Sequence, residues 1–236
     1  MEQKSTKKQW EEYWQSLNHQ PQVIHQDLLD NLLEATDVRG KKVLEVGAGM
    51  GGDGLFLAKK GARVTVLDFS SKALEKIRAS AKKEKIDLET VLADAQKLPF
   101  TDQSFDIIFH QGFLEHFRRP EPYLLEQKRV LKKEGLLVVD VPQRFTTYTI
   151  KKHLLIWQKK WFAGWEREFS IKELENFLKD CGLEIVRSYG WGYYGKLYKL
   201  RHLELGSWYQ KVWQRIESSR LGLYLTFSIG VIAQKK

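Results

Sequence analysis

Between residues 41 and 141, short apolar runs alternate with longer segments whose apolar positions recur at helical spacing. The short runs have the length of buried strands, and the longer segments have the periodicity of amphipathic helices. Strands are predicted at residues 43–46, 63–67, 88–92, 105–109 and 135–140. Helices are predicted at residues 54–60, 72–85 and 121–133. Strands that alternate with helices form βαβ units, so the pattern predicts an α/β fold, a doubly wound three-layer sandwich around a mostly parallel sheet.

A glycine-rich loop separates the first predicted strand from the first predicted helix. Its glycines are Gly47, Gly49, Gly51 and Gly52. Glycine has no Cβ and tolerates φ > 0, so such a loop lets a ligand approach the backbone closely. The start of the following helix presents free N–H groups to a polar or anionic ligand. The loop therefore predicts a site for a nucleotide-like cofactor.

Two cofactor classes are compatible with this loop. The spacing Gly47-x-Gly49-x-x-Gly52 fits a dinucleotide fingerprint, and Asp68 stands where an NAD site places the acid that binds the ribose. Residues elsewhere in the chain indicate a different cofactor. They are Glu45, Asp94-Ala95, Pro99-Phe100, Phe105-Asp106, Glu115-His116 and the stretch 129–135.

In this order and spacing, these residues resemble the class I S-adenosylmethionine-dependent methyltransferases, in particular the type 11 group that includes the quinone-biosynthesis methyltransferases. The resemblance covers residues 40–141. It implies a Rossmann-like, seven-stranded, mostly parallel sheet with a C-terminal antiparallel strand, and the last two strands are expected at residues 183–189 and 223–233. It also implies that S-adenosyl-L-methionine is the cofactor and S-adenosyl-L-homocysteine the product.

The resemblance implies roles for individual residues. Asp68 should accept from both ribose hydroxyls, Phe69 should lie against adenine, and Asp94 should accept from the adenine amino group. His110 and Gln111 should face the methionine part and the sulfur. The full expected cofactor set is Glu45, Gly47, Ala48, Gly49, Gly51, Asp68, Phe69, Asp94, Ala95, His110 and Gln111. Local roles are also compatible with the pattern: a helix N-terminal charge for Asp68, a solvated turn acid for Asp94, and pairing or capping for His110 and Gln111.

Methyl transfer from a sulfonium is an in-line displacement, in which alignment of donor and acceptor supplies much of the rate. A hydroxyl or protonated amine acceptor also requires a base. The candidate bases are His110 and His116, with His153 as a third. Some quinone-pathway relatives bind a divalent metal through a Glu three residues before the Glu-His pair. This chain has Gly112 there, so no metal site is predicted.

The segments that flank the core have a different composition. All eight tryptophans lie outside residues 40–141, and such amphipathic rings carry large contact areas. We therefore expect one methyltransferase domain over residues 1–236 with four parts. They are an N-terminal helical cover at 1–39, a cofactor-binding core at 40–141, a lid or acceptor insertion at 142–169, and a C-terminal part at 170–236 that completes the sheet and carries an aromatic acceptor region, including the stretch 189–195.

The insertion contains a predicted basic amphipathic helix. Its apolar face carries Ile150, Leu154, Trp157 and Trp161, and Lys151, Lys152, Lys159 and Lys160 point elsewhere. Three interpretations remain open. The helix is a lid over the acceptor, a peripheral membrane contact through residues 147–163, or a helix packed on the sheet with solvated lysines.

Composition limits the classes of protein. The chain has 236 residues, 42% apolar residues, a mean hydropathy of −0.45 and no apolar stretch long enough to cross a membrane. The start of the chain lacks the apolar core of a signal peptide, and Cys181 is the single cysteine, for which a packing role is expected. These features predict a cytoplasmic protein. The net charge of +9 is compatible with an anionic partner but does not identify it.

The leading hypothesis is methyl transfer to a bulky, apolar or amphipathic small molecule. The positive charge also favours a nucleic-acid methyltransferase. The usual motifs for amino-group and cytosine-C5 DNA methylation are absent after residue 109, so RNA methylation is the alternative that remains. An NAD(P)-dependent oxidoreductase and a non-catalytic cofactor-binding module are two further hypotheses that the glycine loop allows.

Overall fold

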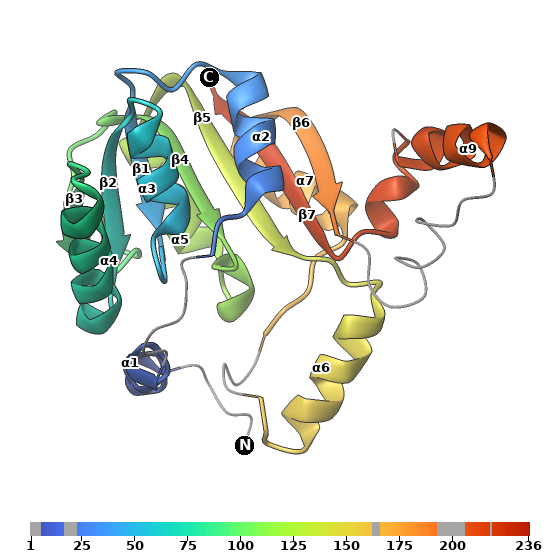
Figure 1. Cartoon of the computed structure of the whole chain (residues 1–236), viewed down its shortest axis with the longest axis horizontal. Helices are drawn as coiled ribbons and strands as arrows, with labels where there is room; N and C mark the ends of the chain where they lie inside the picture. Colours follow the sequence, from blue (N-terminus) through green and yellow to red (C-terminus); the bar gives the residue numbers. More distant parts are fainter. Residues whose placement is uncertain (1–5, 17–22, 162–165, 193–205, 218) are drawn as a thin grey trace.

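The computed structural model describes residues 6–16, 23–161, 166–192, 206–217 and 219–236. Within them, helices cover both faces of one twisted sheet (Figure 1). The strands are β1 Lys42–Val46, β2 Arg63–Asp68, β3 Glu89–Leu92, β4 Phe105–Gln111, β5 Leu131–Pro142, β6 Leu183–Trp191 and β7 Ser228–Lys235. The helices are α1 Lys7–Ser16, α2 Gln26–Ala35, α3 Gly52–Lys59, α4 Ser71–Glu84, α5 Glu121–Val130, α6 Thr147–Trp157, α7 Ile171–Asp180 and α9 Ser207–Glu217, with the 3-10 helices η1 Leu114–His116 and η2 Gly222–Tyr224.

The described strands form one sheet in the order β3-β2-β1-β4-β5-β7-β6. β1 to β5 pair in parallel, and β7 runs antiparallel between β5 and β6. This confirms the predicted seven-stranded, mostly parallel sheet with an antiparallel C-terminal strand. The strand order reverses between β1 and β4, and ligands of open α/β sheets bind at the carboxyl ends of the strands at such a point.

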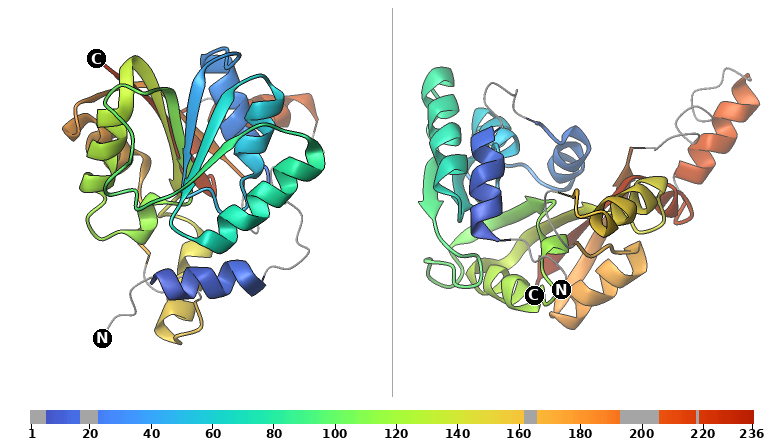
Figure 2. Two further views of the ribbon diagram at one scale, coloured as in Figure 1. Left: turned by 90° about the vertical axis from the view of Figure 1, so that its left-hand side faces the viewer. Right: turned by 90° about the horizontal axis from the view of Figure 1, so that it is seen from below.

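Alternating side chains of the strands build two apolar layers. Val43 of β1 belongs to the layer that α2, α3 and α4 cover, whereas Leu44 belongs to the layer that α5 and α7 cover. Both side chains are fully buried. The edge of the sheet that carries the carboxyl ends of β1 and β4 is not covered in this way; α1 and α6 lie beyond it (Figures 1 and 2).

Predicted boundaries are wrong in two places along the chain. The helix predicted to reach residue 133 ends at Val130, because Leu131 already pairs with Phe105 as the first residue of β5. The last strand is predicted from residue 223, but η2 occupies Gly222–Tyr224 and β7 begins at Ser228.

The amphipathic helix is also different from its prediction. α6 ends at Trp157, so Trp161 lies beyond it and does not share its face. Lys152, which the pattern places away from the body of the protein, is completely buried, whereas Ile150, Leu154 and Trp157 are exposed. The physical reason is an internal ion-pair cluster, described below.

The C-terminal region begins with a strongly capped helix. The Ser170 hydroxyl accepts from the Glu173 backbone N–H, the Glu173 carboxylate accepts from the Ser170 backbone N–H, and Cys181 is a buried residue at the end of α7. Tyr189 and Trp191 lie in β6, whereas residues 193–195 of the predicted aromatic region lie outside the described residues. None of the described helices is both long and apolar enough to cross a membrane.

Candidate cofactor and acceptor site

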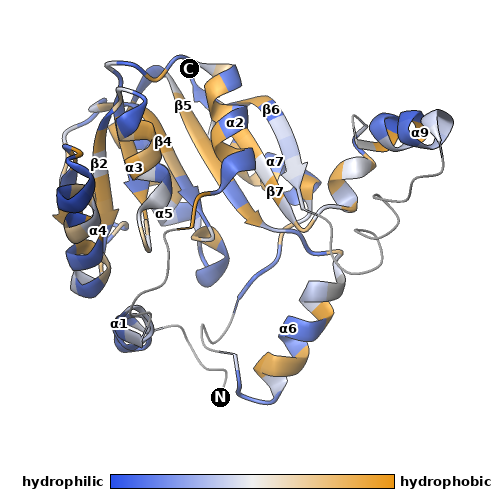
Figure 3. Cartoon of the chain, viewed as in Figure 1, coloured by the Kyte–Doolittle hydropathy of each residue, from blue (hydrophilic) through white to orange (hydrophobic). Residues whose placement is uncertain are grey.

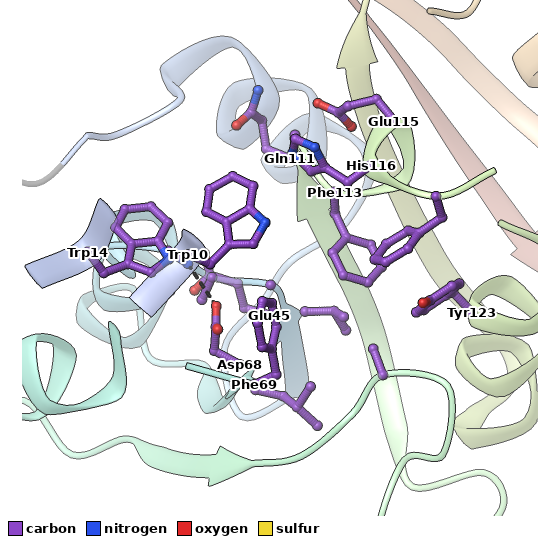
Figure 4. Close-up of a pocket in the computed structure, with 18 of the residues that line it drawn as sticks. Trp10, Trp14, Glu45, Asp68, Phe69, Gln111, Phe113, Glu115, His116 and Tyr123 are labelled. Carbon is purple, nitrogen blue, oxygen red and sulfur yellow. Dashed lines mark hydrogen bonds between the residues drawn. The ribbon is translucent and has the colours of Figure 1, made fainter. Parts of the chain in front are cut away.

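A cavity of about 1430 Å³ lies at the carboxyl ends of the central strands. Cavities that bind one drug-sized ligand usually measure about 300–1,000 Å³, so this one has room for two. Of the predicted cofactor residues, all except His110 line it. Figure 4 shows Asp68 and Phe69 on the side of the cavity near Trp14, with Glu115 and His116 farther along.

The glycine loop turns sharply from β1 into α3. Gly51 is the N-cap of α3 with φ = +67°, a left-handed conformation that favours glycine. A Cβ at Gly51 would stand 2.7 Å from the Ile77 side chain. A Cβ at Gly49 would stand 2.7 Å from the Trp14 ring, so α1 also packs closely on this loop. The backbone of the loop is therefore held between α4 and α1.

Glu45 stabilises the first turn of α3, directly after the glycine loop. Its buried carboxylate accepts a hydrogen bond of 3.0 Å from the Gly54 backbone N–H in the first turn of α3. Burial and the nearby charges of Asp53 and Asp68 raise the pKa of Glu45 well above its usual range. Glu45 lines the cavity and also fixes the start of α3.

Asp68 ends β2 beside the loop. Its Oδ1 accepts from the Ser70 backbone N–H at 2.8 Å and its Oδ2 from the Gly49 backbone N–H at 3.3 Å. The side chain is 3% exposed, and burial raises its pKa to about 6. These two hydrogen bonds hold the carboxylate in place against the glycine loop, on the wall of the cavity.

His110 does not belong to the cavity wall. It is fully buried inside β4, its ring centre lies 5.3 Å from that of Phe113, and neither ring nitrogen has a hydrogen-bond partner among the described residues. Burial lowers its pKa to about 3. The expectation that His110 faces the cofactor or acts as a base is therefore corrected. Gln111, at the carboxyl end of β4, does line the cavity.

The helix α1 lies over the cofactor end, and one acid attaches it. The Glu11 carboxylate accepts from the Ser70 hydroxyl at 3.0 Å, the Ser71 backbone N–H at 3.0 Å and the Lys72 backbone N–H at 3.3 Å. These groups belong to the N-terminus of α4, where a negative charge is favourable. Sequence reasoning missed Glu11, because nothing in its local pattern names a partner about sixty residues away.

The far end of the cavity is aromatic and polar. Its lining includes Tyr148, Trp161, Phe227, Glu115, His116 and Glu166. The Trp161 indole N–H donates to Glu166 Oε1 at 3.0 Å, and His116 Nδ1 lies 3.7 Å from the same oxygen. The His116 ring also meets the Trp10 ring edge-on at a centroid distance of 4.9 Å. Burial raises the pKa of Glu115 well above its usual range and lowers that of His116, so both groups favour their neutral forms.

Behind this end lies a buried ion-pair cluster. Lys152 Nζ lies 2.9 Å from Glu166 Oε2 and 2.8 Å from Glu168 Oε1, and all three side chains are at least nine-tenths buried. Burial disfavours the Lys152 cation, but the two carboxylates outweigh this effect and raise its pKa. The cluster joins α6 to the segment before α7. The sequence pattern placed Lys152 away from the apolar face of the helix and assigned no role to either Glu.

The sequence also gave no indication of the contact between His25 and Asp53. The His25 backbone N–H and Nδ1 lie 2.7 Å from Asp53 Oδ1 and Oδ2, respectively, and both residues line the cavity. Burial disfavours the charged imidazole, but the hydrogen bond and the charge of Asp53 outweigh it and raise the pKa of His25. Among the described residues, no group of three or more His, Cys, Asp or Glu side chains could hold a metal ion.

Part of the chain is similar in sequence to known methyltransferases. Residues 44–139 match the family model described as a methyltransferase domain. The chain is 38% identical over 112 residues to the fatty-acid O-methyltransferase of Mycolicibacterium smegmatis, covering 46% of this chain and 40% of that protein. It is 37% identical over 102 residues to the demethylmenaquinone methyltransferase of Renibacterium salmoninarum, covering 43% and 41%. The chain thus spans about 40% of the length of these relatives.

A solved structure extends the likeness to the whole fold. The magnesium protoporphyrin IX methyltransferase of Synechocystis PCC 6803, solved with bound S-adenosylhomocysteine, matches with a TM-score of 0.64 at 17% identity. The match covers 95% of this chain and 93% of that one. Residues 44–139 thus match a methyltransferase domain, and the chain shares the overall fold of a solved methyltransferase.

Proposed function

We propose that the chain transfers the methyl group of S-adenosylmethionine to a bulky, apolar or amphipathic small molecule. One observation carries the proposal: a single cavity of about 1430 Å³ joins the glycine loop and Asp68 to an aromatic second end. The volume exceeds the usual range for one ligand, and methyl transfer requires two molecules in contact. Relatives that are named for methylating a fatty acid and demethylmenaquinone support an apolar acceptor.

The cofactor belongs at the glycine-loop end in this proposal. Asp68 accepts from the ribose hydroxyls, Phe69 packs against adenine, and Asp94 with the Ala95 N–H binds the adenine edge. The positive-φ glycines allow the methionine part to approach the backbone. Gln111, which lines the cavity, would face the reacting sulfur. The helix α1 covers this end with Trp10 and Trp14, consistent with the assignment of residues 1–39 as a cover.

The acceptor belongs at the other end, between Trp161, Tyr148 and Phe227. S-adenosylmethionine bound at the glycine-loop end would supply an electrophilic methyl group, which the nucleophilic atom of the acceptor would take by in-line displacement, with S-adenosylhomocysteine as the leaving product. Positioning and the exclusion of water are the contributions required of the protein. Residues 142–169 supply the acceptor-side wall, which supports their assignment as an insertion with this role.

A hydroxyl acceptor also has to lose a proton, and His116 is the base that we propose for it. Its burial keeps the imidazole neutral, because burial lowers the pKa of His116, and a neutral ring can accept a proton. Once the ring is protonated, Glu166, whose Oε1 lies 3.7 Å from His116 Nδ1, stabilises the charge. Glu115 beside it has a buried carboxyl oxygen that makes no hydrogen bond within the described residues.

The cofactor assignment is tested by calorimetry with S-adenosylhomocysteine and with NADH. We expect S-adenosylhomocysteine to bind and NADH not to bind. Incubation with S-adenosylmethionine and a panel of quinones, phenols, fatty acids and RNA then identifies the acceptor class. Binding of NADH alone would overturn the cofactor assignment, and methylation of RNA but of no small molecule would overturn the acceptor assignment.

The covering helix yields a separate prediction. Replacing Glu11 with alanine removes three acceptor contacts at the start of α4, which resembles the loss of a helix cap worth about 1 kcal/mol. We expect affinity for S-adenosylhomocysteine, measured by calorimetry, to fall about fivefold. The matched control is Glu12→Ala on the exposed side of α1. An equal affinity of the two variants would show that attachment of α1 does not contribute to cofactor binding.

A further inference from the structure

The helix α6 presents its apolar side chains to solvent. Ile150 is 72% exposed, Leu154 52% and Trp157 80%. Their spacing places them on one stripe along the helix. Phe145, just before the helix, is 59% exposed. The ribbon coloured by hydropathy shows hydrophobic turns on α6 where it projects from the body of the protein (Figure 3).

This orientation is imposed by the interior of the protein. Lys152 points inward to Glu166 and Glu168, and Thr149 donates from its buried hydroxyl to the Gln143 carbonyl oxygen at 3.0 Å. Turning the apolar stripe inward would move Lys152 into solvent and leave two buried carboxylates without their cation, which is costly. The apolar stripe is therefore held outward.

The surroundings of the stripe are basic. From Val141 to Trp165 the sequence contains five Lys and Arg residues and no Asp or Glu. Lys152 is neutralised internally, whereas Lys151, Lys159 and Lys160 are exposed beside or just beyond the stripe. An exposed apolar stripe with a tryptophan, bordered by lysines and free of acids, is the composition of helices that lie in the interface of an anionic membrane.

We propose that α6 docks this protein on an anionic lipid surface. Ile150, Leu154 and Trp157 enter the headgroup region, and Lys151, Lys159 and Lys160 lie against lipid phosphates. A nucleic acid would use the lysines but would leave the aliphatic side chains in water. A protein partner would require complementary acidic groups around an apolar groove, whereas anionic lipid supplies both chemistries in one surface.

The same helix reaches the cavity from its other side. Tyr148, in the first turn of α6, lines the acceptor end, and its ring centre lies 4.8 Å from that of Phe227. Docking through α6 therefore brings the acceptor end close to the lipid surface. The docking itself does not depend on methyl transfer, so it is tested without cofactor or acceptor.

The test is co-flotation of the 236-residue chain with vesicles of phosphatidylcholine alone or of phosphatidylcholine and phosphatidylglycerol in equal amounts. We expect binding to the anionic vesicles only, weakening as salt is added. The variant Lys151→Gln/Lys159→Gln/Lys160→Gln should bind at least about tenfold more weakly. The variant Leu154→Ser/Trp157→Ser should also bind at least about tenfold more weakly, including at low salt.

Matched controls distinguish docking through α6 from the effect of net charge and from nonspecific hydrophobic binding. Lys82→Gln/Lys83→Gln/Lys85→Gln makes the same charge change at exposed positions in and just after α4, and Leu125→Ser/Val186→Ser removes exposed apolar side chains on α5 and β6. Both controls should bind like the unaltered protein, and circular dichroism is used to check that all variants are folded. The proposal is overturned if the protein does not float, if the controls lose binding equally, or if sedimentation shows an α6-dependent dimer in place of vesicle binding.

Discussion

Replacement of Asp68 with alanine is expected to weaken the binding of S-adenosylhomocysteine about 100-fold. A hydrogen bond to a charged group contributes about 1.5–3 kcal/mol, and the proposed carboxylate accepts from two ribose hydroxyls. The side chain is already held by the backbone N–H groups of Gly49 and Ser70, so little ordering is required when the ligand binds. Calorimetry measures the affinity, with Asp87→Ala, an exposed aspartate, as the control.

The same residue predicts a pH dependence. Burial raises the pKa of Asp68 to about 6 in the ligand-free protein, and the ribose hydroxyls bind the charged form. Affinity is therefore complete above this pKa and falls as the pH decreases through it, by about tenfold at about pH 5. Asp68→Asn should remove this contribution, and the difference between the two pH profiles isolates it. Parallel profiles, or an undiminished affinity of Asp68→Ala, would contradict the assignment of Asp68 to the ribose.

Replacement of Lys152 with methionine is expected to lower the free energy of unfolding by about 3–5 kcal/mol. Removing one partner of a buried ion-pair cluster leaves uncompensated charge, here on Glu166 and Glu168. Denaturant unfolding measures the change.

A triple variant serves as the control for Lys152. Lys152→Met/Glu166→Gln/Glu168→Gln contains no unpaired charge and should regain most of the lost stability. Lys151→Met, at the exposed neighbouring position, should change stability by less than about 0.5 kcal/mol. If Lys151→Met and Lys152→Met have equal effects, then the cluster does not hold α6 in the orientation described.

The cofactor end of the site could be predicted in large part from the sequence. Gly49, Gly51 and Asp68 each stand at or just after the end of a predicted parallel strand. The carboxyl ends of such strands meet at one edge of the sheet, so residues distant in the chain are expected to converge there. The structure places Gly49 and Asp68 in hydrogen-bond contact across the adjacent strands β1 and β2.

The sequence did not predict which of two neighbouring residues reaches the cavity, or the residue at which a helix gives way to a strand. His110 and Gln111 are neighbours, but His110 is enclosed within β4 while Gln111 reaches the cavity. Residues 131–133 have a helical pattern, yet Leu131 pairs with Phe105 and belongs to the sheet. Successive side chains of a strand point to opposite faces, which separates His110 from Gln111, and at Leu131 the pairing with β4 outweighs the local helical pattern.

What the sequence determined by itself was the alternation of strands and helices, the glycine turn and the acids at the strand ends, because these follow from short-range spacing and backbone freedom. The tertiary structure alone decided which charges are internal and which apolar side chains are outside. Lys152 is buried because the segment before α7 brings Glu166 and Glu168 into contact with it. Ile150, Leu154 and Trp157 are exposed as a consequence. Burial of a charge depends on partners that are distant in the sequence, and helical periodicity contains no information about them.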